Sequence, residues 1–245
     1  MSNHGPLPRL LLVLTVVSGL LDAVSFLRLD HVFVANMTGN LVFVGLGAAR
    51  ATGFSLGVSL TALAGFLGGA AGTSALLARF PDRARLLRTS TLVKLALEVP
   101  VLTVAADLGI APNRTAVYLF TALLATSMGV QNATVQRLGL SELPTTVVTT
   151  TLTRLVVGLS KGRWRQRESG YRAASIACLF AGAAVGAVLV LEVDAVSALG
   201  LSMVLLASVG FVAHRGALKH AAWTSFPTLS APASDPKDGG EVAAP

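Results

Sequence analysis

A polar string, Asn36-Met37-Thr38-Gly39-Asn40, stands inside an otherwise apolar part of the chain and is the first candidate for binding chemistry. Its amide and hydroxyl groups can bind a polar solute, or they can satisfy free N–H groups where an extended segment turns into a helix. A helix that begins here also presents free amide groups to an anionic or dipolar substrate. Asn36, Thr38, Gly39 and Asn40 are therefore candidate binding residues, with a purely structural role as the alternative.

Asp22 is the strongest single candidate, because it lies well inside an apolar stretch that is long enough to cross a membrane. A carboxylate at the centre of a membrane helix costs roughly 2.5 to 3.5 kcal/mol even on the permissive insertion scale. One role that offsets this cost is a coupling site for a proton or another cation. The other is structural: Asp22 hydrogen-bonds to Asn40 or to the adjacent junction and holds the fold.

The second half of the chain offers a related set of polar residues. Gln131 and Asn132 are neighbours, about 100° apart on a helix, so at most one can squarely face a central cavity, and we favour Asn132. Thr149 lies in a threonine-rich stretch that matches the first polar string in character. Arg154 is expected to bind an anion, to pair with Asp22, or to extend toward the cytoplasmic interface.

Lys94 and Glu98 are spaced to meet on one helical face, near the expected cytoplasmic end of their span, and predict a local ion pair. The histidines lie at span ends or in the tails, at His4, His31, His214 and His220. They offer no base for a serine hydrolase and no cluster with carboxylates for a metal. With no phosphate-binding glycine loop either, we expect no enzyme activity, no metal and no cofactor.

The composition explains which elements must hold these residues. The 245 residues have a mean hydropathy of +0.70 and are 53% hydrophobic but only 13% charged, against about 25% charged in a soluble domain. Apolar windows of the ~20 residues that a membrane helix needs recur along the chain. The net charge of +7 comes from basic residues in short loops, as the positive-inside rule describes, and does not indicate nucleic acid. The sequence predicts an all-α polytopic membrane protein with a single membrane domain over residues 1–220.

An internal repeat divides this domain. Gly19-Leu-Leu-Asp22-Ala23 matches Gly129-Val-Gln-Asn132-Ala133 at a shift of 110 residues, which predicts halves of about 8–112 and 113–215. Farther on, the glycine run that starts at Gly65 resembles the run that starts at Gly182 after an insertion of about seven residues. Small residues at these spacings permit close helix packing, within one chain or in a homo-oligomer.

Each half has four apolar segments, at 8–27, 33–49, 55–79 and 90–111 in the first and at 115–134, 145–160, 172–192 and 196–213 in the second. If all eight crossed, the basic loops at 79–88 and 161–167 would lie on opposite faces, against the positive-inside rule. If the short segments 33–49 and 145–160 enter and return, about six transmembrane helices remain. Both termini are then cytoplasmic and the halves are inverted, as in many transporters. The tail, 221–245, is predicted to be disordered.

The strings Gly19-Leu-Leu-Asp22-Ala23-Val-Ser-Phe, Val32-Phe-Val-Ala-Asn36-Met-Thr-Gly-Asn40 and Met128-Gly-Val-Gln131-Asn132-Ala133 together resemble the YoaK family of bacterial integral membrane proteins. The resemblance covers residues 8–215 and implies a multi-spanning protein of the bacterial inner (plasma) membrane, sometimes described as a small permease, with no named substrate. Its partners are then the lipid bilayer and a small molecule or ion. A small-solute permease or secondary transporter is the first hypothesis. A passive channel with re-entrant half-helices and a non-transporting membrane scaffold are the alternatives.

Overall fold

The computed structural model describes residues 5–77, 82–139, 166–218 and Thr224, and all regular structure within them is helical. The helices are α1 (Leu7–Arg28), α2 (Met37–Ala48), α3 (Leu56–Leu77), α4 (Arg83–Leu108), α5 (Arg114–Leu138), α7 (Gln166–Val188), the π-helix η1 (Leu189–Val193) and α8 (Ala195–Leu218). The expected segment at 145–160 and the tail at 221–245 lie outside the described residues.

Four helical stretches among the described residues are long and apolar enough to cross a bilayer. They are Leu7–Arg28, Leu56–Ala75, Gly170–Val193 and Ala195–Leu218, which have between 20 and 24 residues. At ~1.5 Å per residue, each spans the roughly 30 Å of a hydrocarbon core. Their length and composition, together with the absence of strands from the described residues, confirm the prediction of a helical membrane protein.

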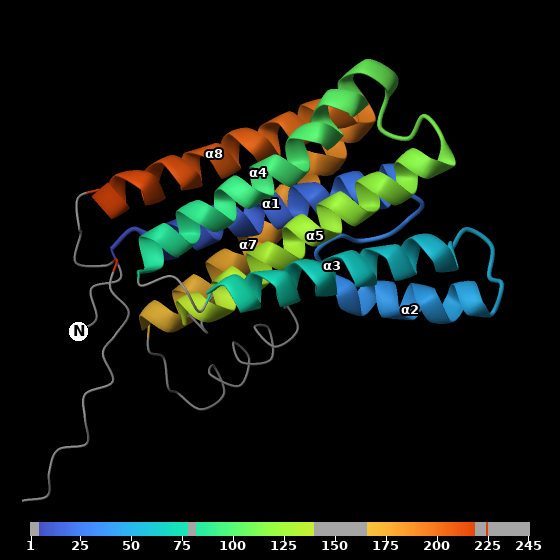
Figure 1. The fold of residues 1–245 in the computed structure, drawn as a ribbon. Helices are drawn as coiled ribbons and strands as arrows, with labels where there is room; N and C mark the ends of the chain where they lie inside the picture. The colour runs from blue at the N-terminus through green and yellow to red at the C-terminus, as the bar shows by residue number, and fades with distance from the viewer. Residues whose placement is uncertain (1–4, 78–81, 140–165, 219–223, 225–245) are drawn as a thin grey trace, which may run out of the picture.

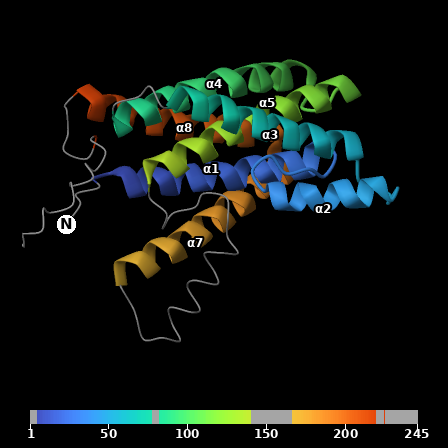
Figure 2. The same cartoon turned by 60° about the horizontal axis from the view of Figure 1, so that its bottom comes forward.

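The long helices lie side by side, and α1 is the innermost of the apolar ones (Figures 1 and 2). In α1 61% of the membrane-length window is buried, against 22 to 33% in the other three. α1 packs against α7 and α8, whereas α5 packs against α3 and α4, and α4 also contacts α8. α1, α4, α5 and α8 therefore surround the centre of the bundle, with α3 and α7 outside them.

Glycines let α1 and α5 approach their outer neighbours closely. A methyl group added at Gly19 would overlap the backbone carbonyl of Leu179 on α7, and one added at Gly129 would overlap the carbonyl of Phe66 on α3. Such contacts bring helix backbones together as small residues do in membranes. Both glycines thus pack within this chain.

The short segment 33–49 contains the expected half-helix, but its entry bends at Val34 and Ala35 instead of being extended. The chain reverses after α1, where Asp30 and His31 have positive φ angles of 63° and 58°, and α2 then runs from Met37 to Ala48 along α3. Ser55, directly before α3, lies 3.5 Å from Arg114, which also pairs with Asp30 at the end of α1. The segment that contains α2 therefore begins and ends at the same end of the bundle (Figure 1).

The start of α4 was predicted wrongly. The segment expected at 90–111 begins at Arg83, because Asp82 caps the helix by accepting a hydrogen bond from the Arg85 amide at 2.7 Å. The basic residues expected in a loop therefore form the first turns of α4. Because α4 begins seven residues earlier than predicted, each later residue lies about 10 Å farther from the start of the helix than predicted, at ~1.5 Å per residue.

Candidate functional site

Asp22 and Asn40 hold the non-helical segment that precedes α2. Oδ1 of Asp22 accepts hydrogen bonds from the backbone amides of Val34 and Ala35, at 2.9 and 2.7 Å. The Asn40 side chain is fully buried; its Oδ1 accepts from the Phe33 amide at 2.9 Å and its Nδ2 donates to the Phe33 carbonyl at 2.5 Å. Asp22 thus has the structural role that the sequence allowed, because it binds the backbone of the junction before α2.

The other residues of the polar string do not converge on one binding site. Asn36 precedes α2, but its side chain makes no capping hydrogen bond, contrary to expectation, and both Asn36 and Thr38 are exposed. The ring of Phe33 lies where a side chain at Gly39 would stand, which explains the glycine. The Asn40 amide is bound to the Phe33 backbone and so helps to position α2, whereas binding roles for Asn36, Thr38 and Gly39 stay predictions.

A layer of buried polar side chains crosses the middle of the bundle instead. It separates two apolar clusters, one around Leu11, Leu87 and Leu206 toward the end where α1 begins, the other around Val24 and Phe120 toward the opposite end. All four central helices contribute to this polar layer, with Ser18 on α1, Lys94 and Glu98 on α4, Ser127 and Gln131 on α5, and Ser202 on α8.

The centre of the polar layer is the ion pair of Lys94 and Glu98. The Nζ of Lys94 lies 3.4 Å from Oε1 of Glu98, and each residue is only 1% exposed. The Ser127 hydroxyl donates to the same carboxylate oxygen, and Nζ of Lys94 lies 3.5 Å from the sulfur of Met128. Lys94 is about 16 Å from the start of α4, and Glu98 about 15 Å from its end, at ~1.5 Å per residue. The expectation of a pair near the cytoplasmic end was wrong, because α4 begins earlier than predicted.

Two oxygen atoms in the polar layer are buried without a hydrogen-bond partner, Oε2 of Glu98 and Oε1 of Gln131. The amide nitrogen of Gln131 donates to α1, to the Ser18 hydroxyl at 2.8 Å and to the Leu14 carbonyl at 3.2 Å. An unpaired buried acceptor costs about 1 to 3 kcal/mol. Natural cores seldom retain such groups without a reason, and both oxygens lack the donor that a buried acceptor normally has.

The preference for Asn132 was wrong, because Gln131 is the residue that faces the interior. Gln131 is 1% exposed at the α1–α5 contact, whereas Asn132 is only partly buried. Ser127, Gln131 and Thr134 share one face of α5, at spacings of four and three residues. That periodicity was a usable signal in the sequence, and it points to the same stripe that the structure buries.

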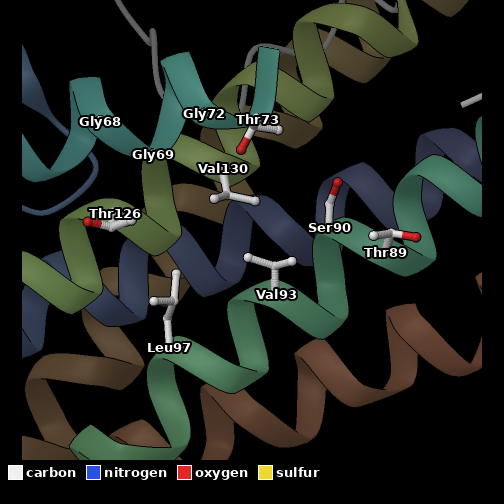
Figure 3. A pocket seen from close by; sticks show the side chains of 10 residues that line it. All are labelled: Gly68, Gly69, Gly72, Thr73, Thr89, Ser90, Val93, Leu97, Thr126 and Val130. Carbon is white, nitrogen blue, oxygen red and sulfur yellow. The ribbon is translucent and has the colours of Figure 1, made fainter. Parts of the chain in front are cut away.

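Two hollows lie near the polar layer, one beside it on the outer face of the bundle and one beyond it toward the end of α4. The first, of about 280 Å³, lies between α3, α4 and α5 (Figure 3), lined by Gly68, Gly69, Gly72, Thr73, Thr89, Ser90, Val93, Leu97, Thr126 and Val130. Val93 and Leu97 directly precede the two members of the ion pair. The second, of about 340 Å³, lies beyond Ala105 at the far end of α4 and includes Arg28 and Asp194. The fully buried Val101 stands between Glu98 and this second hollow.

Arg154 and Thr149 lie outside the described residues, so their binding roles and a contact of Arg154 with Asp22 stay predictions. Among the residues that the structure describes, no three His, Cys, Asp or Glu side chains gather where they could hold a metal ion. Gly182 and Gly186 pack against α1 of the same chain, whereas Gly68 and Gly72 face open space.

Comparisons with known proteins agree with the membrane architecture. Residues 10–212 match the family model described as "Protein of unknown function (DUF1275)". Over 152 residues the chain is 35% identical to the UPF0700 transmembrane protein YoaK of Bacillus subtilis (strain 168), which covers 62% of this chain and 66% of that relative, just under two thirds. No solved structure matches the chain. The chain therefore belongs to the DUF1275 family, as a multi-pass helical membrane protein related to YoaK.

Proposed function

We propose that this protein is a small-solute permease of the secondary-transporter type, with its solute site at the polar layer. The observation that carries the proposal is the Lys94–Glu98 ion pair, which is buried midway along α4. Ionisable side chains within membrane helices are rare and usually belong to substrate or ion pathways. Stability alone is a weak reason for a scaffold to keep such a pair, because replacing a buried ion pair by apolar side chains of similar volume is often neutral or stabilising.

The proposed topology has six crossings, with α4 and α5 as the two polar spans. Basic residues gather at the end of the bundle where α1 begins, at Arg9, Arg83, Arg85, Arg88, Arg137 and Arg215. The opposite end carries a mixture of both signs, at Arg28, Asp30, Arg50, Asp107, Arg114, Glu192 and Asp194. By the positive-inside rule, the first end and both termini face the cytoplasm of a bacterial inner membrane.

The helix contacts support inverted halves. At the shift of 110 residues α1 corresponds to α5, and the two run in opposite directions through the bundle (Figure 1). α1 packs on α7 and α8 as α5 packs on α3 and α4. Gly182 abuts Val16, and Gly69 abuts Thr126, which lies 110 residues after Val16. This register pairs Gly69 with Gly182 at a shift of 113, which favours an insertion of three residues over the seven that the sequence suggested.

The two apolar clusters close the polar layer toward both ends of the bundle, as an occluded state of alternating access requires. The second hollow ends at Ala105, and the buried Val101 separates it from Glu98. Movement of one half against the other would open the layer to each side in turn. A passive channel would instead need a continuous path past Val101.

Uptake into proteoliposomes tests this function. A panel of small polar metabolites is offered to vesicles that contain the wild type, the Lys94→Met variant, or no protein. We expect gradient-dependent uptake of at least one solute by the wild type only, and stabilisation of the wild type by that solute in thermal unfolding. Uptake that ignores imposed proton and sodium gradients would favour a channel. Neither uptake nor stabilisation across the panel would favour a scaffold and refute the transporter.

A further inference from the structure

Two hydrogen-bond acceptors in the polar layer have no donor. Glu98 receives Lys94 and Ser127 on Oε1, while Oε2 has no partner, and Gln131 has an unpartnered Oε1. Gln131 stands one helical turn from Ser127 on the same face of α5, beside the level of Lys94, whose Nζ contacts Met128. A proton on Oε2 of Glu98 turns one of these acceptors into a donor and leaves the Gln131 oxygen as an acceptor in the same layer.

The charge of the polar layer limits what can cross with that proton. The ammonium of Lys94 and the carboxylate of Glu98 sum to zero in the empty site, which suits a low-dielectric interior. When Glu98 takes up a proton, the carboxylate charge disappears and the Lys94 ammonium loses its counter-ion. The site then carries one unpaired positive charge, which is costly to bury. A monoanion on Lys94 restores neutrality.

We propose, on the basis of the transporter function above, that the Lys94–Glu98 pair carries one proton together with one small monoanion. The proton leaves water on one side, binds Oε2 of Glu98 and is released to water on the other side. The anion binds the Lys94 ammonium that protonation has freed and departs with the proton, so that Lys94 and Glu98 pair again. The loaded and the empty site are both neutral, and the cycle moves no net charge.

Asp22 on α1, about one helical turn beyond Ser18, already accepts the Val34 and Ala35 amides on its Oδ1. The ionisable groups of the helices that pack against α4 lie away from the level of the pair. α4 packs against α5 and α8. The ionisable side chains of α5 lie toward its two ends, at Arg114, Tyr118 and Arg137. Those of α8, His214 and Arg215, lie beyond Gly210, which faces Thr91, and so toward the start of α4. On α4 itself the basic residues of the first turns and Asp107 near the end are all remote from the pair.

Infrared spectroscopy of the purified full-length protein tests the binding step. Nitrate, chloride, methanesulfonate and gluconate are added separately at constant pH, and the carboxylic-acid band is recorded. By linkage, an anion that binds with the proton must increase the protonation of Glu98. We expect at least one anion to raise this band in the wild type and in the Asp107→Asn control, an exposed acid-to-amide change on the same helix. The rise should be absent in Glu98→Gln. A band that no anion changes would overturn the proposal.

Proton flux in proteoliposomes tests the coupling. An inward gradient of the same anions should acidify the lumen of wild-type vesicles, as an enclosed pH dye reports, at a rate that a valinomycin-clamped membrane potential does not alter. Glu98→Gln should exchange the labelled anion without acidification, and Lys94→Met should do neither. Acidification by Glu98→Gln at the wild-type rate, or a rate that follows the potential, would overturn the coupling. Uptake of an uncharged solute with no anion effect would overturn it while leaving the permease function intact.

Discussion

Asp22 provides a quantitative test, because the structure gives it a structural role where the sequence also allowed a coupling role. In Asp22→Ala, the amides of Val34 and Ala35 lose the carboxylate that accepts them at 2.9 and 2.7 Å. A hydrogen bond to a charged group contributes about 1.5 to 3 kcal/mol, so the two together predict a loss of about 3 to 6 kcal/mol. Asp22→Asn keeps an oxygen acceptor but not its charge. Neutral bonds contribute about 0.5 to 1.5 kcal/mol each, which predicts a smaller loss of about 2 to 3 kcal/mol.

Reversible unfolding in mixed detergent micelles measures both variants. Accessibility of a cysteine placed at Ala35, which is 4% exposed, reports whether the segment before α2 stays docked. We expect the order wild type, Asp22→Asn, Asp22→Ala in stability, with greater labelling of the alanine variant. The Asp22→Asn protein that remains folded should still show gradient-dependent uptake. An Asp22→Asn variant with wild-type stability and no response to a proton gradient would refute this reasoning and return the coupling role to Asp22.

Two further predictions concern packing and pH. Gly129→Ala and Gly19→Ala should each lower the free energy of unfolding by about 1 to 3 kcal/mol, because the added methyl overlaps a backbone carbonyl of the neighbouring helix. Unfolding in mixed micelles measures this loss. Gly200→Ala is the control, because a methyl group there meets no neighbour. Ser197 lowers the pKa of Asp194 by hydrogen bonding. The carboxylate should therefore add stability above the pKa of its unfolded form and lose it as the pH falls through the lower, folded value. A thermal-unfolding series at acidic pH should decline less in Asp194→Asn, and an unchanged decline would contradict this.

Hydropathy and segment length predicted most of the membrane architecture. The predicted bounds lie within a few residues of the observed ones, at one end or at both, for α1, α3, α7 and α8. A run of apolar residues that is long enough to span a bilayer seldom forms anything but a membrane helix. The half-helix α2 was also foreseen, because its apolar segment is too short to cross.

The candidate site was predicted less well, for one physical reason above all. The Arg83–Arg88 stretch was assigned to a loop by its charge, although Asp82 caps a helix there. With α4 expected to begin at residue 90, Lys94 fell near a membrane face, and the buried ion pair was assigned a local role. The choice between Gln131 and Asn132 depended on how α5 is rotated against α1 and α4, which only the packing of all three helices determines.

The double variant Lys94→Met/Glu98→Met tests most directly whether the polar layer is the functional centre. Replacing both members of a buried ion pair by apolar side chains of similar volume is often neutral or stabilising, whereas removing one leaves an unpaired charge. We therefore expect the double variant to unfold at or above the wild-type temperature, and to take up none of the solute that the wild type transports into proteoliposomes. A folded double variant that transports this solute at the wild-type rate would contradict the account.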